Sequence, residues 1–324
     1  MANLKELSKN AERVTGGHRL CAGCGAGVVA RQTLIAAENM PVVVVSATGC
    51  LEVSTSVFPY TSWKTPFFHS AFENSAATCS GVEAAYKSLI RQGKIKDEPI
   101  RFIAFGGDGG TYDIGLQSLS GAMERGHRML YVCYNNEAYM NTGIQRSSAT
   151  PQGASATTSP VGKVKQGKEQ PKKDLTAIIA AHNVPYAAQA IIGDFNDYIT
   201  KVQKALNTDG PTFINVLTPC RLGWGCKPED SMEMVRLAVD TCIWPVYEVE
   251  NGKYKMTKKP RGGKKLPVGE FFKHQSRFKH LLKPQNADLL ARIQADVDAK
   301  WEKICNLCGD EVIKSCTTVH YFRL

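Results

Sequence analysis

Two polar side chains follow β-rich runs at points where strands would end. Residues 101–105 run into the glycine-rich segment GGDGG, which carries Asp108, and residues 129–134 run into a polar turn that carries Asn136. Ligands bind outside the carboxyl ends of strands in open α/β sheets, so Asp108 and Asn136 are expected to meet at such an edge. A carboxylate and an amide oxygen suit Mg²⁺, and glycines let backbone N–H groups approach phosphate oxygens. For this loop alone, a plain strand-to-helix connection is the alternative.

Four of the eleven cysteines sit on turns flanked by glycine or proline. Cys21 and Cys24 form a CxxC pair, Cys50 follows the segment ATG, and Cys220 follows Thr-Pro. Four thiolates are the ligands of a [4Fe–4S] cluster, although a CxxC pair by itself also fits zinc or a redox dithiol. Sequence spacing does not bring Cys220 to the other three cysteines; only the expected fold does. Cys226 is the alternative fourth ligand.

A second CxxC pair, Cys305 and Cys308, lies near the end of the chain and is followed by Cys316. This group lacks a clear fourth ligand, so free thiols at a frayed helix end are favoured over a second metal site. The first residues contain no apolar core of signal-peptide length. Many cysteines in such a chain indicate metal ligation or buried thiols rather than disulfides.

The elements that must position these residues alternate between strand and helix. Between residues 41 and 217, β-rich runs alternate with helical patterns, which predicts an α/β fold with a doubly wound, mostly parallel sheet. Residues 51–73 are polar and aromatic and are expected to form a functional loop. An Asn-Gly pair at 251–252 predicts a hairpin, and apolar spacing predicts a helix over 268–282. We therefore expect an α/β domain over 1–245, followed by a basic C-terminal extension over 246–324 that packs on it or on a partner subunit.

Composition and charge narrow the class of protein. The 324 residues are 43% hydrophobic and 22% charged, as in ordinary globular proteins, and no run approaches the length of a transmembrane span. A cytoplasmic chain with no membrane contact is expected. The net charge of +10 is concentrated in residues 253–283, where Glu270 is the one acidic residue. No nucleic-acid-binding module is recognisable there, so a solvated tail or an arm around another subunit is favoured over a nucleic-acid site.

The motifs together resemble one enzyme family. GDG followed by NN resembles the thiamine-diphosphate motif, and the downstream segment YMNTG is similar to that of the 2-oxoacid:ferredoxin oxidoreductases. The segments CAGC, ATGC and TPC match that family's cluster-binding pieces and occur in the same order. The resemblance covers roughly residues 17–245 and is to the thiamine-binding beta subunit. Within the family, the segments GCLEVSTS and GGDGGTYDIGLQSLSGAMERGH resemble the pyruvate-oxidising members.

The resemblance implies a role for each motif residue. Asp108, the Asn136 side chain and the Ala138 carbonyl would hold Mg²⁺ on the diphosphate of thiamine diphosphate. Asn141 would be the catalytic residue that faces the reacting carbon. The full set expected to contact the thiamine cofactor is Cys50, Gly107, Asp108, Gly109, Asn136, Ala138, Asn141 and Thr142. A [4Fe–4S] cluster would be held by Cys21, Cys24, Cys50 and Cys220. Ile144 departs from the small or polar residue expected after Thr142-Gly143.

The family's reaction is the oxidative decarboxylation of a 2-oxoacid, with electrons passed singly through the cluster toward ferredoxin. Pyruvate, giving acetyl-CoA and CO₂, is the expected substrate, and oxalate or another 2-oxoacid is the alternative. A non-redox thiamine-dependent decarboxylase would need no positioned thiolates, and a zinc- or nucleic-acid-binding protein would leave GDGG and YMNTG unexplained. The resemblance also implies partners: alpha, gamma and delta subunits or fused equivalents, one of which supplies the glutamate that activates the thiamine ring. Coenzyme A and ferredoxin complete the set.

Overall fold

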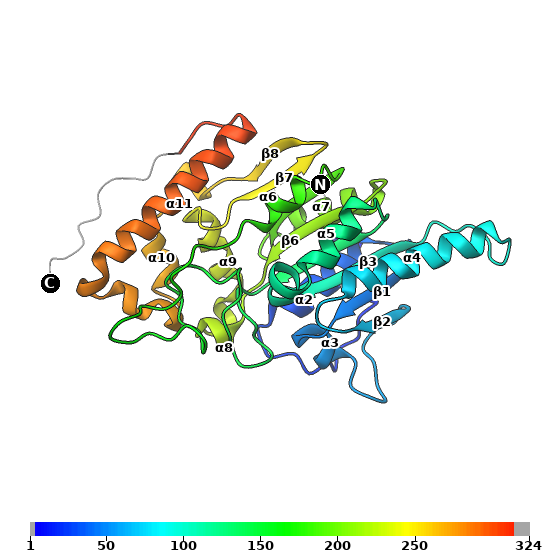
Figure 1. The fold of residues 1–324 in the computed structure, drawn as a ribbon, viewed down its shortest axis with the longest axis horizontal. Coiled ribbons are helices and arrows are strands. Elements are labelled where there is room, and N and C mark those ends of the chain that lie inside the picture. The colour runs from blue at the N-terminus through cyan, green and yellow to red at the C-terminus, as the bar shows by residue number, and fades with distance from the viewer. Residues whose placement is uncertain (1–3, 314–324) are drawn as a thin grey trace.

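The protein is described by a computed structural model, which covers residues 4–313. Its centre is an eight-stranded sheet in the order β2-β1-β3-β4-β6-β5-β7-β8 (Figure 1). The strands are β1 (Val42–Ala47), β2 (Phe67–Ser70), β3 (Arg101–Gly107), β4 (Leu130–Asn135), β5 (Tyr186–Ile191), β6 (Thr212–Leu217), β7 (Val246–Glu250) and β8 (Lys253–Lys258). The six strands from β2 to β5 in this order are parallel, and β7 and β8 are antiparallel additions at the far edge.

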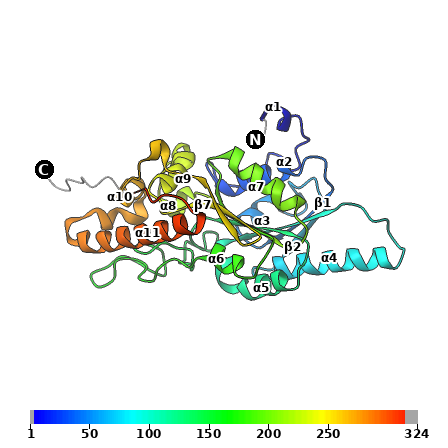
Figure 2. The ribbon, with the colours of Figure 1, turned by 90° about the horizontal axis from the view of Figure 1, so that it is seen from above.

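Helices cover both faces of the sheet, which confirms the predicted doubly wound α/β fold (Figure 2). α2 and α7 pack together on one face, and α4, α5 and α6 lie on the other. Every residue of β4, β5 and β6 is buried, as expected for strands covered on both sides. The α-helices are α1 (Leu4–Leu7), α2 (Gly25–Ala36), α3 (Cys50–Thr55), α4 (Ser75–Arg91), α5 (Leu116–Glu124), α6 (Leu175–Ala180), α7 (Phe195–Asn207), α8 (Arg221–Trp224), α9 (Ser231–Asp240), α10 (Val268–Phe272) and α11 (Ala287–Cys308).

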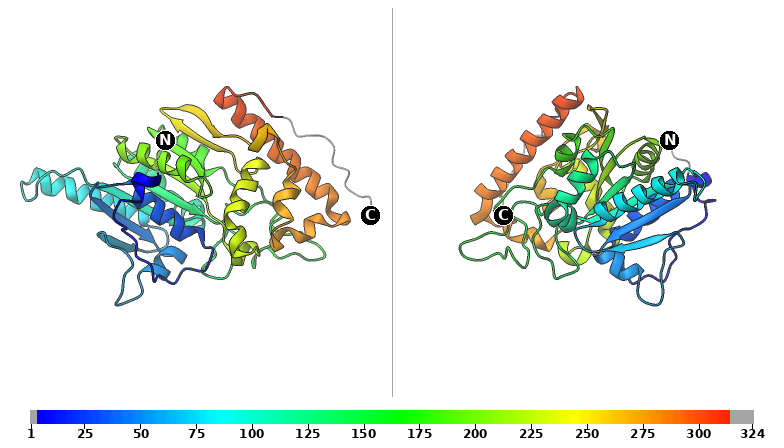
Figure 3. Two further views of the ribbon diagram at one scale, coloured as in Figure 1. Left: turned by 180° about the vertical axis from the view of Figure 1, so that it is seen from behind. Right: turned by 45° about the vertical axis from the view of Figure 1, so that its right-hand side comes forward.

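The region after residue 245 continues the same body. The predicted hairpin is present as β7 and β8, and both turn residues, Asn251 and Gly252, have positive φ as a tight hairpin turn requires. α11 packs on β8 and lies at the opposite end of the molecule from the projecting end of α4 (Figure 3). Several basic residues of this region pair with acidic residues of the same chain, among them Lys258 with Asp194 at 2.5 Å.

Two predicted elements were wrong. The expected loop over 51–73 contains α3 at its start and the edge strand β2 near its end. The expected helix over 268–282 is broken into α10 and the 3₁₀ helix η4 (Ser276–Leu282). Gln275 between them has extended backbone geometry, with φ −128° and ψ 123°. No helix among residues 4–313 is both long and apolar enough to cross a lipid bilayer.

Candidate active site

Four neighbouring strands end side by side and carry the residues singled out by the sequence. Their order is β1, β3, β4 and β6, and all four are parallel. Asp108 and Asn136 follow the two central strands, β3 and β4, while Cys50 and Cys220 follow the flanking strands β1 and β6. The sheet therefore presents two oxygen-bearing side chains at its middle and one thiol on either side, at the edge where α/β proteins bind ligands.

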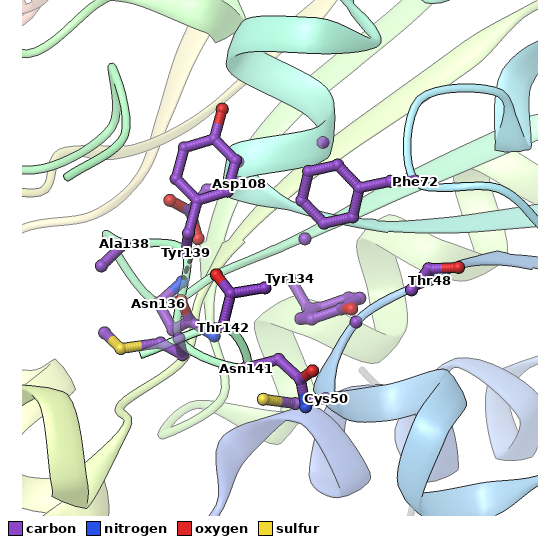
Figure 4. Close-up of a pocket in the computed structure, with 15 residues that line it drawn as sticks. Thr48, Cys50, Phe72, Asp108, Tyr134, Asn136, Ala138, Tyr139, Asn141 and Thr142 are labelled. Atoms are coloured by element: carbon purple, nitrogen blue, oxygen red, sulfur yellow. Dashed lines mark hydrogen bonds between the residues drawn. The ribbon is translucent and has the colours of Figure 1, made fainter. Parts of the chain in front are cut away.

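A pocket lies at this edge (Figure 4). The pocket is lined by every residue expected to contact the thiamine cofactor: Cys50, Gly107, Asp108, Gly109, Asn136, Ala138, Asn141 and Thr142. Sequence reasoning missed further lining residues: Thr48, Gly49, Phe72, Gly110, Tyr134, Tyr139 and Met140. The side chain of Asn141 lies beside Cys50, and its hydrogen bond stabilises the thiolate of Cys50.

Three oxygen atoms converge beside Asp108. The amide oxygen of Asn136 faces Asp108 Oδ1 and the Ala138 carbonyl oxygen, and the two separations are 2.9 and 2.8 Å. Oxygen atoms at such short separations repel one another. Two arrangements remove the repulsion: the amide is reversed, so that its nitrogen donates to both oxygens, or a cation lies between the three oxygens. Ligands of an octahedral Mg²⁺ at 2.0–2.1 Å are about 2.9 Å apart, which matches the spacing here. The reversed amide satisfies both oxygens by hydrogen bonds in the cofactor-free protein, and the amide with its oxygen turned inward completes a donor set that fits Mg²⁺.

Asp108 is enclosed. Its side chain is 1% exposed, and burial raises its pKa to about 7. Ser147 Oγ donates to Asp108 Oδ2 at 2.5 Å, and the Asn136 backbone N–H donates to Oδ1 at 3.3 Å. These two hydrogen bonds favour the carboxylate but do not offset its burial, so a bound cation would supply the missing compensation.

The glycine loop passes beneath an aromatic wall. Gly109 begins a single turn of π-helix, η1 (Gly109–Ile114), and a Cβ at Gly109 would lie 2.6 Å from ring atoms of Tyr139. The Tyr139 ring stacks on Phe72, with centroids 5.6 Å apart, and its hydroxyl donates to Asp113 Oδ2 at 3.0 Å. The backbone of this loop therefore lies as near the Tyr139 ring as glycine permits.

Replacement of Gly110 by alanine tests how tightly the loop is packed. A Cβ at Gly110 would lie 2.7 Å from the backbone carbonyl oxygen of Phe72, which no rotamer change can move. We expect Gly110→Ala to lower the free energy of unfolding by about 1–3 kcal/mol in urea denaturation. Gly81→Ala in α4, where a Cβ meets nothing within 4 Å, is the matched control and should stabilise by about 0.5–1 kcal/mol. Equal effects of the two substitutions would contradict this packing.

The CxxC turn docks on the turn that carries Cys220. The backbone N–H of Gly25 donates to the Pro219 carbonyl at 3.3 Å, and a Cβ at Gly25 would lie 2.8 Å from Thr218 Cβ. Gly23, with φ 75°, is pressed against the backbone of Pro228 in the same way. Close approach at two glycines thus brings Cys21 and Cys24 to Cys220, a contact that sequence spacing alone does not predict.

The four thiols share one electrostatic environment. Burial raises the pKa of Cys24 and of Cys220, and raises that of Cys50 to about 11. Every pair among Cys21, Cys24, Cys50 and Cys220 interacts, each thiolate raising the pKa of a neighbour. Backbone N–H groups of Ala26 and Gly27 point at Cys24 and favour its thiolate, as do those of Leu222 and Gly223 at Cys220. Clustered thiols supplied with N–H donors fit an iron–sulfur cluster, whose sulfur ligands are hydrogen-bonded in this way.

The remaining cysteines stand apart from this group. Cys226 interacts with Cys220, and burial and the charge of Arg277 affect its pKa more than Cys220 does. Cys305 and Cys308 lie in the last turns of α11, and Cys316 lies outside the described residues. Within residues 4–313, no three His, Cys, Asp or Glu side chains are grouped as a site for a single metal ion.

A buried ion network next to the oxygen triad escaped sequence reasoning. Glu137, between Asn136 and Ala138, pairs with Lys172 at 2.8 Å and with Arg277 at 2.6 Å. Trp224 Nε1 donates to the Asn136 carbonyl at 2.8 Å. The signal available in the sequence was weak, because Lys172 and Arg277 belong to basic stretches that read as solvated.

Comparison with known proteins adds a family description. A family model described as "Thiamine pyrophosphate enzyme, C-terminal TPP binding domain" matches residues 47–216. A solved 2-oxoglutarate:ferredoxin oxidoreductase from Magnetococcus marinus superposes with a TM-score of 0.54 at 19% identity, covering 69% of this chain and 79% of that one. At this identity the likeness concerns the fold alone.

Curated relatives match over nearly their whole length. The pyruvate synthase subunit PorB of Thermotoga maritima is 51% identical over 321 residues, covering 96% of this chain and 98% of the relative. PorB of Methanocaldococcus jannaschii is 54% identical, covering 90% and 95%. The ketoisovalerate oxidoreductase subunit VorB of Pyrococcus abyssi is 42% identical, covering 91% and 93%.

Proposed function

This chain belongs to the thiamine-diphosphate-binding subunits of the 2-oxoacid:ferredoxin oxidoreductases, and from that membership we propose that its substrate is pyruvate. The support is the identity to PorB subunits, which is 51–54% in two of them against 42% to the VorB subunit. The reaction is an oxidative decarboxylation that gives acetyl-CoA and CO₂. A different 2-oxoacid, such as oxalate or 2-oxoisovalerate, is the second candidate.

The single observation that carries the redox character of the proposed reaction is the order of the strand ends. β3 and β4 bring Asp108 and Asn136 together, and β1 and β6 place Cys50 and Cys220 on either side. A non-redox thiamine enzyme has no use for thiols in this position. A decarboxylation that releases electrons one at a time needs an acceptor close to where they arise, and this arrangement provides a place for one.

Each residue of the pocket has a proposed task. Asp108, Asn136 and the Ala138 carbonyl hold Mg²⁺, and Gly107 and Gly109 let the loop backbone approach the diphosphate. Asn141 acts as the catalytic residue, its amide orienting the 2-oxoacid beside Cys50, and Thr142 assists at the phosphate side. Thiamine diphosphate supplies the electron sink that decarboxylation of a 2-oxoacid requires.

The cysteine group has a separate task. We assign Cys21, Cys24, Cys50 and Cys220 as the four ligands of one [4Fe–4S] cluster, which accepts single electrons. The mutual influence of these thiols and the N–H groups aimed at Cys24 and Cys220 support this ligand set over one that includes Cys226.

The chain works within a complex of several subunits. We propose alpha, gamma and delta subunits or their fused equivalents as partners, together with coenzyme A and ferredoxin, in the cytoplasm. One partner supplies the glutamate that activates the thiamine ring. We further propose that residues 1–245 form the thiamine- and cluster-binding unit and that residues 246–324 extend it.

The test is an assay of the assembled complex with a panel of 2-oxoacids. Anaerobically purified complex should reduce ferredoxin with pyruvate and coenzyme A at least about tenfold faster, in kcat/KM, than with 2-oxoisovalerate, 2-oxoglutarate or oxalate. Omission of coenzyme A should suppress turnover with pyruvate. A preference for another 2-oxoacid would contradict pyruvate as the substrate. Decarboxylation without reduction of ferredoxin would contradict the proposed oxidoreductase activity.

A further inference from the structure

A buried cation from the C-terminal region lies beside residues 136–138, which carry two of the proposed Mg²⁺ ligands and are called the metal-binding loop below. Arg277, in η4, donates to Glu137 Oε2 at 2.6 Å, and the two side chains are 4% and 5% exposed. Lys172 holds the other carboxylate oxygen of Glu137 at 2.8 Å. Removal of one partner from such a buried network leaves an uncompensated charge, so the network strongly constrains its members.

Glu137 occupies a strained position that matters for metal binding. It lies between Asn136 and Ala138, which supply two of the three converging oxygens, and its φ of 68° is unusual for a residue other than glycine. Strained backbone persists only where surrounding contacts fix it. Here the contacts are the two ion pairs and a hydrogen bond from Thr150 Oγ1 to the Glu137 carbonyl at 2.6 Å.

The same arginine touches the turn that carries Cys220. Its guanidinium lies 4.3 Å from the centre of the Trp224 ring, and Trp224 Nε1 donates to the Asn136 carbonyl at 2.8 Å. The Trp224 backbone N–H donates to the Cys220 carbonyl, also at 2.8 Å. Arg277 and Trp224 therefore join the metal-binding loop to the Cys220 turn as one packed unit.

A glycine allows η4 to approach this turn. Gly225 ends α8 with φ 63°, and a Cβ there would lie 2.6 Å from Ser276 Cβ, a contact that rotation of the serine side chain cannot relieve and that would displace η4. The backbone N–H of Ser155, from the long segment between β4 and α6, donates to the Arg277 carbonyl at 2.9 Å. The position of Arg277 is thus fixed on both sides by backbone.

The charge of Arg277 acts on the cysteines as well. The backbone N–H of Trp224, on whose ring the guanidinium stacks, donates to the Cys220 carbonyl, so this buried positive charge lies beside the turn that carries Cys220. Arg277 therefore stabilises negative charge on sulfur at one end of the unit and pairs with Glu137 at the other. Reduction adds a negative charge to a cluster, so a fixed cation nearby favours the reduced state.

We propose that Arg277 is a positioning residue that fixes the metal-binding loop against the Cys220 turn and, through its charge, raises the reduction potential of the cluster. The inference rests on the proposed function, because it assumes that both cofactors are bound. It assigns to the C-terminal region a direct part in the chemistry of the site, beyond packing.

The test compares Arg277→Lys, Arg277→Met and the control Lys279→Met, which removes an exposed charge from the same segment. Each variant is assembled with its partner subunits under anaerobic conditions. Thiamine diphosphate affinity with Mg²⁺ is measured by calorimetry and iron content by colorimetry. The midpoint potential is measured by redox titration, on the cluster signal that Cys50→Ser abolishes.

Arg277→Lys should leave the midpoint potential unchanged, because the positive charge remains. It should weaken thiamine diphosphate binding about tenfold, because the planar guanidinium and its stacking on Trp224 are lost. Arg277→Met should weaken binding at least as much and shift the potential to a more negative value. Lys279→Met should match the unmodified complex in both.

Wild-type affinity in Arg277→Lys would overturn the positioning role, and this decides the question even if Arg277→Met does not assemble. An unchanged potential in an assembled Arg277→Met complex would overturn the electrostatic role. Failure of the unmodified complex to bind iron or thiamine diphosphate would instead overturn the proposed function, and this inference with it.

Discussion

Asp108→Asn is expected to abolish cofactor binding without unfolding the protein. The substitution removes the one charged oxygen of the converging triad, so affinity for thiamine diphosphate in the presence of Mg²⁺ should fall at least about 100-fold, more than the 10–100-fold typical of supporting residues. Because burial raises the pKa of Asp108 to about 7, the ionised carboxylate is costly in the cofactor-free protein. The neutral amide should therefore leave the free energy of unfolding above pH 7 unchanged or higher.

Calorimetric titration, urea denaturation and iron analysis on the same preparations separate these effects. Asp194→Asn serves as the matched control. Asp194 is the N-cap of α7 and accepts from the Asp197 backbone N–H at 3.0 Å, a cap that asparagine also provides. Asp194→Asn therefore removes chiefly the charge that pairs with Lys258, and should cost at most about 1 kcal/mol of stability and leave the cofactor affinity intact. If Asp108→Asn lost iron and thiamine diphosphate together, the result would point to a damaged fold rather than a missing ligand.

Serine substitutions in the cysteine group should empty the cluster site. The anaerobically purified chain is expected to be brown, with about four iron and four sulfide. Cys21→Ser, Cys24→Ser, Cys50→Ser and Cys220→Ser should each reduce the iron to near zero, because each removes one of four ligands. Cys226→Ser should retain iron, because Cys226 is not one of the four proposed ligands.

Thiamine diphosphate binding provides the internal control for these variants. Cys24→Ser leaves the oxygen triad untouched and should bind the cofactor within about threefold of the unmodified chain. Zinc in place of iron in the purified protein would contradict the assignment of these cysteines to an iron–sulfur cluster. If Cys226→Ser lost iron and Cys220→Ser retained it, the fourth ligand would be Cys226 and not Cys220.

The parallel strands and the cofactor-binding residues of the pocket could be predicted from the sequence because both depend on local sequence patterns. The apolar run of β1 predicts a buried strand, and the glycine turn after β3 predicts where β3 ends. Parallel pairing then brings such ends together, whatever the chain between them does. Hence the sequence alone predicts that Asp108, Asn136 and Cys50 lie at one edge of the sheet.

Features that depend on distant contacts could not be read in this way. β2 has only four residues and lies at the sheet edge, where pairing with β1 rather than its own pattern defines it. Arg277 belongs to a basic stretch typical of solvent-exposed chain, and its partner Glu137 is 140 residues away. Burial of that cation depends on Trp224 and Phe278 lying against it, which no local pattern predicts.

The position of the cysteines along the chain limits how this protein can be recombined or redesigned. The matched family segment spans residues 47–216 and contains Asp108, Asn136 and Cys50. Cys21 and Cys24 precede it, and Cys220 and Arg277 follow it. A transplanted segment would carry the metal-binding loop but one thiol of four. The two flanks would therefore have to be transferred together with this segment to preserve the proposed cluster site.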